Sequence, residues 1–147
     1  MEELVNKLKE ALADTYSFAL KAQSYHWNVM GSDFPQLHDF FGEIYEEAQD
    51  AVDPIAEQIR QLDAFAPSTL SRMKELSSVE EDEKIPVAIK MVENLIVAND
   101  VVMKTMTEAY KMAEEQESFA LSNFLQDRLT AHSKHRWMLK ATAGQKA

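Results

Sequence analysis

The feature that most constrains this chain is the return of apolar residues every three or four positions along four long stretches. Such spacing places the apolar side chains on one face of a helix, and other helices must then cover that face. Only three glycines and four prolines interrupt the 147 residues, too few for the frequent turns of an all-β protein. The sequence therefore predicts an all-α fold built from long helices.

Residues that break or cap helices predict where the long helices end. We expect Gly31 to end the first helix and Pro35 to lie in the first turn of the second. Pro54 removes a backbone hydrogen bond and should kink the second helix. Ile89 and Trp137 are assigned to the apolar faces of the third and fourth helices. The four helices are predicted over residues 3–30, 35–62, 86–115 and 118–142.

A long connection separates the second and third helices. Within it, residues 68–76 predict a short capped helix, and the charged residues 80–84 predict a solvated loop. A connection of this length can run along the whole bundle. The predicted architecture is a four-helix bundle with a short extra helix in its long connection, formed by a single domain of residues 1–147.

Charge and cysteine content narrow the function classes. The formal net charge is −10, which repels nucleic acid unless the cations are gathered on one face, and residues 143–147 offer no basic arm. Cysteine is absent, which fits a reducing compartment. The first residues contain no uninterrupted apolar run, and no stretch reaches the roughly 20 apolar residues of a membrane span. We expect a cytoplasmic protein with no membrane partner and no tight DNA binding.

Two pairs of residues can ligate a metal ion. Asp53 and Glu57 are one turn apart on the second helix, whereas His26 and His38 lie on either side of the loop before it. Fifteen residues separate His38 from Asp53, roughly 22 Å along a helix, so one ion cannot bind both within a chain. An antiparallel second copy would bring its carboxylates to these histidines, which predicts a site shared between subunits.

The two histidines and two carboxylates suit iron, zinc or manganese, and open positions would suit Fe(II) that gives electrons to an oxidant. An alternative interpretation explains each of these residues separately, without a metal ion. Asp53 and Glu57 are then solvated surface acids, and His26 is a satisfied core histidine. Spacing alone favours this alternative interpretation.

The residues around these pairs resemble the Dps family of small ferritin-like proteins from starved and stressed bacteria. The resemblance covers almost the whole chain and extends to the short helix after Pro67. The gaps between His26, His38, Asp53 and Glu57 match the ferroxidase ligands of the family in register. The matching segments are YHWNV at 25–29, LH at 37–38, AE at 56–57 and KHRW at 134–137, together with Phe34 and Asp53.

The resemblance implies a ferritin-like bundle that assembles into a hollow dodecamer built from two-fold dimers. Members of the Dps family oxidise ferrous iron, usually with hydrogen peroxide, store the ferric mineral and protect the cell from oxidative damage, and the resemblance implies the same activity here. The implied metal and catalytic ligands are His26 and His38 of one subunit facing Asp53 and Glu57 of its neighbour. Glu57 would bridge two irons, with zinc able to take the place of iron.

One position departs from the family pattern. An Asp usually follows the second histidine by four residues, and here that position is Gly42. The second metal position thus loses a carboxylate, which predicts weaker binding there, a reduced rate, and a gain from Gly42→Asp. Two alternatives stay open: a Dps-like structural shell that is catalytically weak or binds a single metal, and, more remotely, a DNA-compacting protein.

The other two histidines of the chain lie on the fourth predicted helix. His132 and His135 are three apart on the fourth helix and could bind a metal, although such residues are more commonly at the surface or satisfied by hydrogen bonds. Trp27 follows the first histidine and could donate an electron, but packing at an interface is its simpler role.

Overall fold

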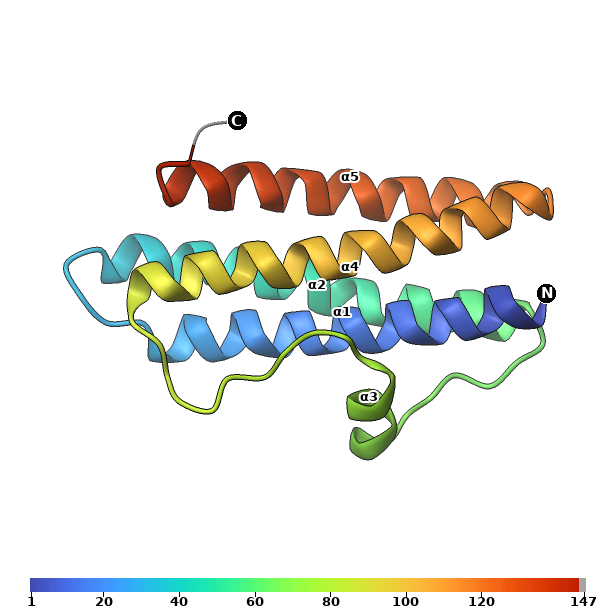
Figure 1. Ribbon diagram of the computed structural model, residues 1–147, viewed down its shortest axis with the longest axis horizontal. Helices are drawn as coiled ribbons and strands as arrows, with labels where there is room; N and C mark the ends of the chain where they lie inside the picture. Colours follow the sequence, from blue (N-terminus) through green and yellow to red (C-terminus); the bar gives the residue numbers. More distant parts are fainter. Residues whose placement is uncertain (146–147) are drawn as a thin grey trace.

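The computed structural model describes residues 1–145, which form five helices and no strand. Residues 146 and 147, part of the tail predicted to lack a basic arm, lie outside this range. Four long helices run side by side, and a short helix lies outside them (Figure 1). The predicted all-α bundle with a short extra helix is confirmed. The helices are α1 (Glu2–Asn28), α2 (Phe34–Gln61), α3 (Leu70–Leu76), α4 (Ala88–Glu115) and α5 (Phe119–Thr142).

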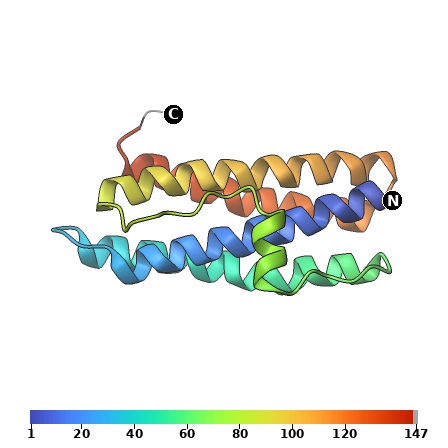
Figure 2. The same cartoon turned by 60° about the horizontal axis from the view of Figure 1, so that its bottom comes forward.

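The lengths of the connections decide how the helices run. Short loops make α1 antiparallel to α2, and α4 antiparallel to α5 (Figure 1). The connection of residues 62–87 carries α3 across the outside of α1 and returns the chain along the bundle, as Figure 2 shows. As a result, α4 begins at the same end of the molecule as α2, which is the long crossover that the sequence predicts.

The apolar faces of the long helices pack into one core. Its largest fully buried side chains come from α1, α2 and α4, and each contributes about 1.5–3 kcal/mol to folding. Two residues assigned to apolar faces are instead exposed, Ile89 by 52% and Trp137 by 67%. Ile89 lies in the first turn of α4, where no other helix covers it, and Trp137 borders an open groove between α4 and α5.

The predicted helix ends shift by a few residues. α1 stops at Asn28 because Val29 becomes extended and turns its side chain into the core, where it is 2% exposed. Gly31 then takes φ +126°, a backbone conformation that other residues rarely adopt. Pro35 lies in the first turn of α2 as predicted. α2 continues through Pro54 as one helix, and the kink expected at this proline stays a prediction.

A buried carboxylate anchors the long connection to the bundle. Asp14 of α1 is 1% exposed and accepts a hydrogen bond from the Ser78 backbone N–H at 2.7 Å. The Ser77 hydroxyl donates to the same carboxylate at 3.2 Å, and the Thr105 hydroxyl of α4 donates at 2.6 Å. Asp14 therefore joins α1, α4 and the end of α3.

The charged residues 80–84 form an exposed loop, as predicted, and contacts of Asp82 anchor this loop to the bundle. The Asp82 carboxylate accepts hydrogen bonds from the Tyr25 hydroxyl at 2.5 Å and from Asn94 at 3.4 Å. Lys21 pairs with Asp82 at 3.3 Å. These contacts fix the loop beside the C-terminal half of α1, two turns or less from His26.

Candidate metal centre

The two histidines predicted as ligands lie against each other where α1 ends and α2 begins. The rings of His26 and His38 are stacked, with centroids 3.9 Å apart and planes 14° from parallel. Phe34 stacks on His38 with a centroid distance of 5.1 Å. The short loop between the helices thus brings the pair together, as their positions in the sequence predict.

The backbone of each histidine orients the ring of the other. Nδ1 of His26 lies 2.6 Å from the carbonyl oxygen of His38, and Nδ1 of His38 lies 2.6 Å from the carbonyl oxygen of His26. A carbonyl can only accept, so each Nδ1 carries a proton and donates it. In the neutral form of such an imidazole Nε2 is the atom with a free lone pair, and this is the form that binds a metal ion.

The missing side chain at Gly42 makes room for the His26 ring. A Cβ at this position would lie 2.9 Å from Nδ1 and 3.0 Å from Cε1 of His26. The ring cannot move aside freely because its Nδ1 is bonded to the His38 carbonyl. A Gly42→Asp side chain would therefore first displace the ring of a candidate ligand. The gain in metal binding expected from this substitution stays a prediction, and this close contact argues against it.

The two carboxylates lie apart from the histidines. Asp53 and Glu57 are exposed on α2, one turn from each other, and Asp53, the nearer of the two, is roughly 22 Å along the helix from His38. Within residues 1–145 no three His, Asp or Glu side chains are grouped so that they could hold a metal ion. One chain thus offers the predicted ligands only as two pairs. Asp53 also borders an open groove with Leu12, Tyr16 and Met73.

Large apolar side chains remain uncovered beside the histidine pair. Trp27 is 62% exposed, Met30 is 82% exposed and Phe34 is 41% exposed. Apolar groups gathered in this way commonly mark an interface with another protein. This end of the bundle therefore carries both unsatisfied ligand atoms and a surface suited to a partner.

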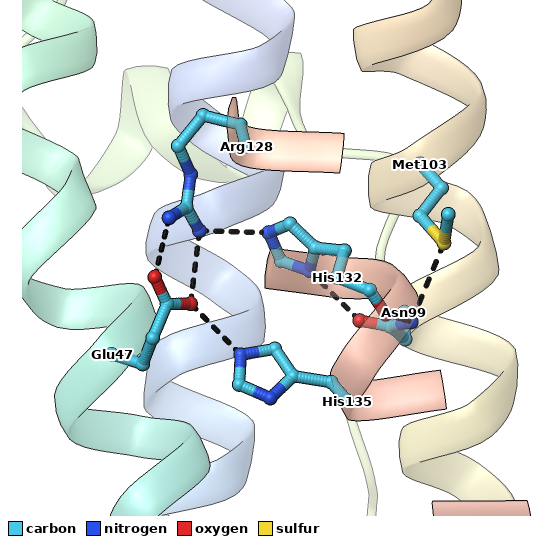
Figure 3. A network of polar contacts seen from close by, with 6 residues as sticks. All are labelled: Glu47, Asn99, Met103, Arg128, His132 and His135. Carbon is cyan, nitrogen blue, oxygen red and sulfur yellow. Dashed lines mark hydrogen bonds and ion pairs between the residues drawn. The ribbon is translucent and has the colours of Figure 1, made fainter. Parts of the chain in front are cut away.

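A second polar cluster lies between α2, α4 and α5 (Figure 3). His132 and His135 are buried, and both are satisfied by hydrogen bonds, which is the commoner of the two situations predicted for them. Glu47 pairs with Arg128 and accepts a hydrogen bond from His135 at 2.8 Å. Sequence reasoning missed Glu47 and Arg128, although Arg128, His132 and His135 share one helical face through their spacing of four and three.

Burial and charge shift the pKa values in this cluster in opposite ways. Burial, reinforced by the positive charge of Arg128, lowers the pKa of His132 to about 3, so this imidazole is neutral. Burial alone would raise the pKa of Glu47. The hydrogen bonds from His135 and Arg128 outweigh that effect and hold the pKa well below its ordinary range. The cluster thus contains an ionised carboxylate, a guanidinium and a neutral imidazole.

Comparison with known proteins decides the family. A family model described as the ferritin-like domain matches residues 5–146. A DNA protection during starvation protein from Helicobacter pylori is 33% identical over 135 residues, which cover 91% of this chain and 94% of the relative. The chain belongs to the Dps family of ferritin-like proteins.

Solved structures of Dps proteins have the same fold as this Dps chain. Dps from Staphylococcus aureus gives a TM-score of 0.93 at 29% identity, covering 99% of this chain and 98% of its own. A Dps protein from Vibrio cholerae O1, described as a member of a broad superfamily of ferritin-like diiron-carboxylate proteins, gives 0.91 at 26% identity, covering 95% and 88%. The ferritin-like fold implied by the resemblance is thereby confirmed. No helix in the described part of this Dps chain is long and apolar enough to cross a membrane.

Proposed function

We propose that this Dps protein oxidises ferrous iron and stores the ferric product inside a closed shell in the cytoplasm, which protects the cell from oxidative damage. Membership of the Dps family supports iron storage and protection. One observation carries the proposal furthest. The chain has an imidazole pair with two free Nε2 lone pairs and a carboxylate pair that lies too far away to bind the same ion.

The two pairs complete each other in a two-fold dimer. His26 and His38 of one chain would face Asp53 and Glu57 of a second chain, and symmetry would create two identical sites. The exposed Trp27 beside the histidines supplies apolar surface for such a contact. We propose that six dimers of this single-domain chain close into the dodecameric shell.

The ligand set fits ferrous iron as the substrate. Imidazole nitrogen with carboxylate oxygen suits iron, and zinc can compete for the same atoms. His26 and Asp53 would hold the tighter iron position, Glu57 would contact both positions, and His38 would serve the weaker one. Gly42 offers no carboxylate there, so this proposal includes an uneven pair of sites. The two hydrogen bonds to backbone carbonyls hold both imidazole rings in place before iron arrives.

Hydrogen peroxide is the proposed oxidant. Two ferrous ions give one electron each, and the peroxide takes up two protons and becomes two water molecules. Positive charge increases at the metals during this step, and the carboxylates of Asp53 and Glu57 stabilise it by direct electrostatic attraction. Each imidazole keeps its proton on Nδ1, where it is donated to a backbone carbonyl, and takes no part in the proton uptake by peroxide.

Mixing two inactive variants tests whether the site is shared. One variant carries His26→Ala and His38→Ala, and the other carries Asp53→Ala and Glu57→Ala. In a mixed dimer one site combines the intact histidines of the second variant with the intact carboxylates of the first. Co-expression should therefore restore about a quarter of the wild-type rate of iron oxidation by peroxide, because half of randomly formed dimers are mixed and each has one whole site.

Each variant alone is the control and should lack rapid oxidation. A mixture that stays as inactive as its components, with normal assembly by light scattering, would contradict a shared site. Oxidation by one of the variants alone at the wild-type rate would contradict the ligand assignment itself.

A further inference from the structure

The guanidinium of Arg128 lies between Glu47 and His132 in the buried cluster (Figure 3). Its Nη2 is 3.1 Å from Oε1 of Glu47 and 3.0 Å from Nε2 of His132, and its Nη1 pairs with the other carboxylate oxygen. Nε2 of His135 approaches the same Oε1 at 2.8 Å. The Glu47 carboxylate of α2 and the His132 imidazole of α5 thus contact the guanidinium, and the His135 imidazole of α5 contacts the same carboxylate.

Contacts with Asn99 make Nε2 of the His132 ring a hydrogen-bond acceptor. Asn99 of α4 donates from Nδ2 to the His132 carbonyl at 2.9 Å, which leaves its Oδ1 facing Nδ1 of His132 at 2.8 Å. Nδ1 must therefore carry the proton and donate it. The lone pair of Nε2 points at the guanidinium, and burial keeps the ring neutral.

We propose that Glu47, His132 and His135 form a divalent-metal site inside each chain, and that the Arg128 guanidinium occupies it in place of the metal ion. Two imidazoles and a carboxylate are ligands that iron, cobalt and zinc share. Helix bundles build metal sites in this way, from Glu and His side chains on facing helices. A metal-binding histidine usually donates its other ring N–H to an acceptor that fixes the orientation of the ring, and Asn99 does this for His132.

The guanidinium keeps the site closed. It is charged at every working pH, so it neutralises Glu47 permanently and does not leave by titration. Its Nη2 lies about 3 Å from Oε1 of Glu47 and from Nε2 of His132, whereas a metal ion lies about 2.0–2.2 Å from its ligand atoms. With the guanidinium in place, no three His, Asp or Glu side chains within residues 1–145 are grouped closely enough to hold a metal ion. The buried Nε of Arg128 has no partner, so the contacts of the two Nη atoms alone hold the group in place. Metal ions are thereby kept out of the bundle interior.

Removing the guanidinium should open the site. The experiment compares Glu57→Ala, which impairs the proposed site between subunits, with Glu57→Ala combined with Arg128→Ala. Titration with Co²⁺ should show one additional bound ion per chain only in the double variant, with visible absorption bands of nitrogen- and oxygen-bound cobalt. Zn²⁺ should raise the melting temperature of that variant alone. His135 must move its proton from Nε2 to Nδ1 when it binds the ion.

Two matched variants separate a true site from a mere cavity. Arg128→Lys keeps a positive charge and should take up no additional Co²⁺. Adding His132→Gln to the double variant keeps the cavity but removes a ligand, and the additional uptake should be lost. Equal uptake with and without His132, or no additional uptake after Arg128→Ala, would overturn the proposal.

Loss of folding is also informative. Where Arg128→Ala fails to fold without metal, recovery of the helical circular dichroism on adding Co²⁺ supports the site. Arg128→Gln, a smaller change that is also neutral, serves as the second variant. Failure of both variants to fold in the presence of Co²⁺ means that the three ligands cannot hold a metal, and it overturns the proposal.

Discussion

At the scale of single residues, the histidine pair depends on an atom that is missing, the Cβ of Gly42. A glycine inside a helix costs about 1 kcal/mol relative to alanine, and here it also removes a carboxylate expected from the family. Without that Cβ, the His26 ring can lie with Nδ1 only 2.9 Å from the position that the Cβ would take, and can donate to the His38 carbonyl. Glycine at position 42 thus allows the His26 imidazole to be held in place, whereas aspartate there would supply an additional carboxylate ligand.

Gly42→Ala should therefore destabilise the protein, although the same change in an exposed helix stabilises it by about 1 kcal/mol. We expect a loss of about 1–3 kcal/mol, because the added Cβ would lie 2.9 Å from Nδ1 of His26 and force the ring to shift. Urea denaturation monitored by circular dichroism measures the change. In a His26→Ala background the same substitution should be neutral or stabilising, and a loss of equal size there would show that the ring is not the cause.

A second residue-scale prediction concerns pH and His132. Its pKa is lowered from 6.5 to about 3 in the folded chain, so as the pH falls below about 6.5 the unfolded chain binds a proton that the folded chain excludes. This group alone should reduce the free energy of unfolding by about 1.4 kcal/mol for each pH unit below 6.5. His132→Gln removes that contribution, so its stability between pH 7 and pH 5 should depend less on pH. A slope equal to that of the wild type would contradict the assignment.

At the scale of elements, the long connection between α2 and α4 is held by side chains rather than by its own secondary structure. Of residues 62–87 only α3 is helical. Asp14 at one point and Asp82 at another bind this segment to α1 and α4. The sequence pattern predicts α3 and the loop but not these two anchors, because each anchor includes a contact with a residue more than fifty positions away.

Substitutions at Asp14 should separate the need for an acceptor from the need for a charge. Burial raises the pKa of the Asp14 carboxyl even though Thr105 and Ser78 donate to it, so the charge itself is disfavoured there. We expect Asp14→Asn to change the free energy of unfolding by less than about 1 kcal/mol. Asp14→Ala leaves buried donors without an acceptor and should cost about 2–4 kcal/mol. Chemical denaturation compares the two, and equal losses would contradict this account.

At the scale of the whole molecule, one chain leaves its candidate metal ligands and several large apolar side chains at the surface. The histidine pair, its exposed aromatic neighbours and the two carboxylates lie on the outside of a bundle whose interior is already complete. Assembly is therefore the step at which the proposed iron site would form.

Assembly should be visible in solution. Twelve chains of 16.8 kDa make a particle of about 200 kDa, and we expect light scattering after size exclusion to find this mass at micromolar concentration. Trp27→Glu would place a charge in the proposed interface and should shift the population towards smaller species. A wild-type protein that is only monomeric at that concentration would contradict the proposed shell.

Charge at this scale predicts weak interaction with DNA. Each chain carries a formal net charge of −10, so a dodecamer repels the phosphate backbone. We expect no retardation of duplex DNA in a gel at about 150 mM salt, where the Debye length is about 8 Å. Strong retardation under these conditions would reveal a clustered basic surface on the assembled protein.

The sequence by itself determined the features that depend on local periodicity. Apolar spacing predicts the four long helices, and a rise of about 1.5 Å per residue separates Asp53 from His38 by roughly 22 Å, which already excludes a site within one chain. The residues around His26 indicate the Dps family, and the comparisons confirm it.

Only the tertiary structure decided which side chains meet. The same periodicity assigns Ile89 and Trp137 to apolar faces, yet both are exposed because no other helix covers them. Glu47 and Arg128 are 81 residues apart and show no local sign of pairing until α2 and α5 pack together. The cost of a Cβ at Gly42 likewise depends on the position of a ring from another helix. A repeat in the sequence shows which face of a helix is apolar, whereas the packing of distant segments decides what lies against it.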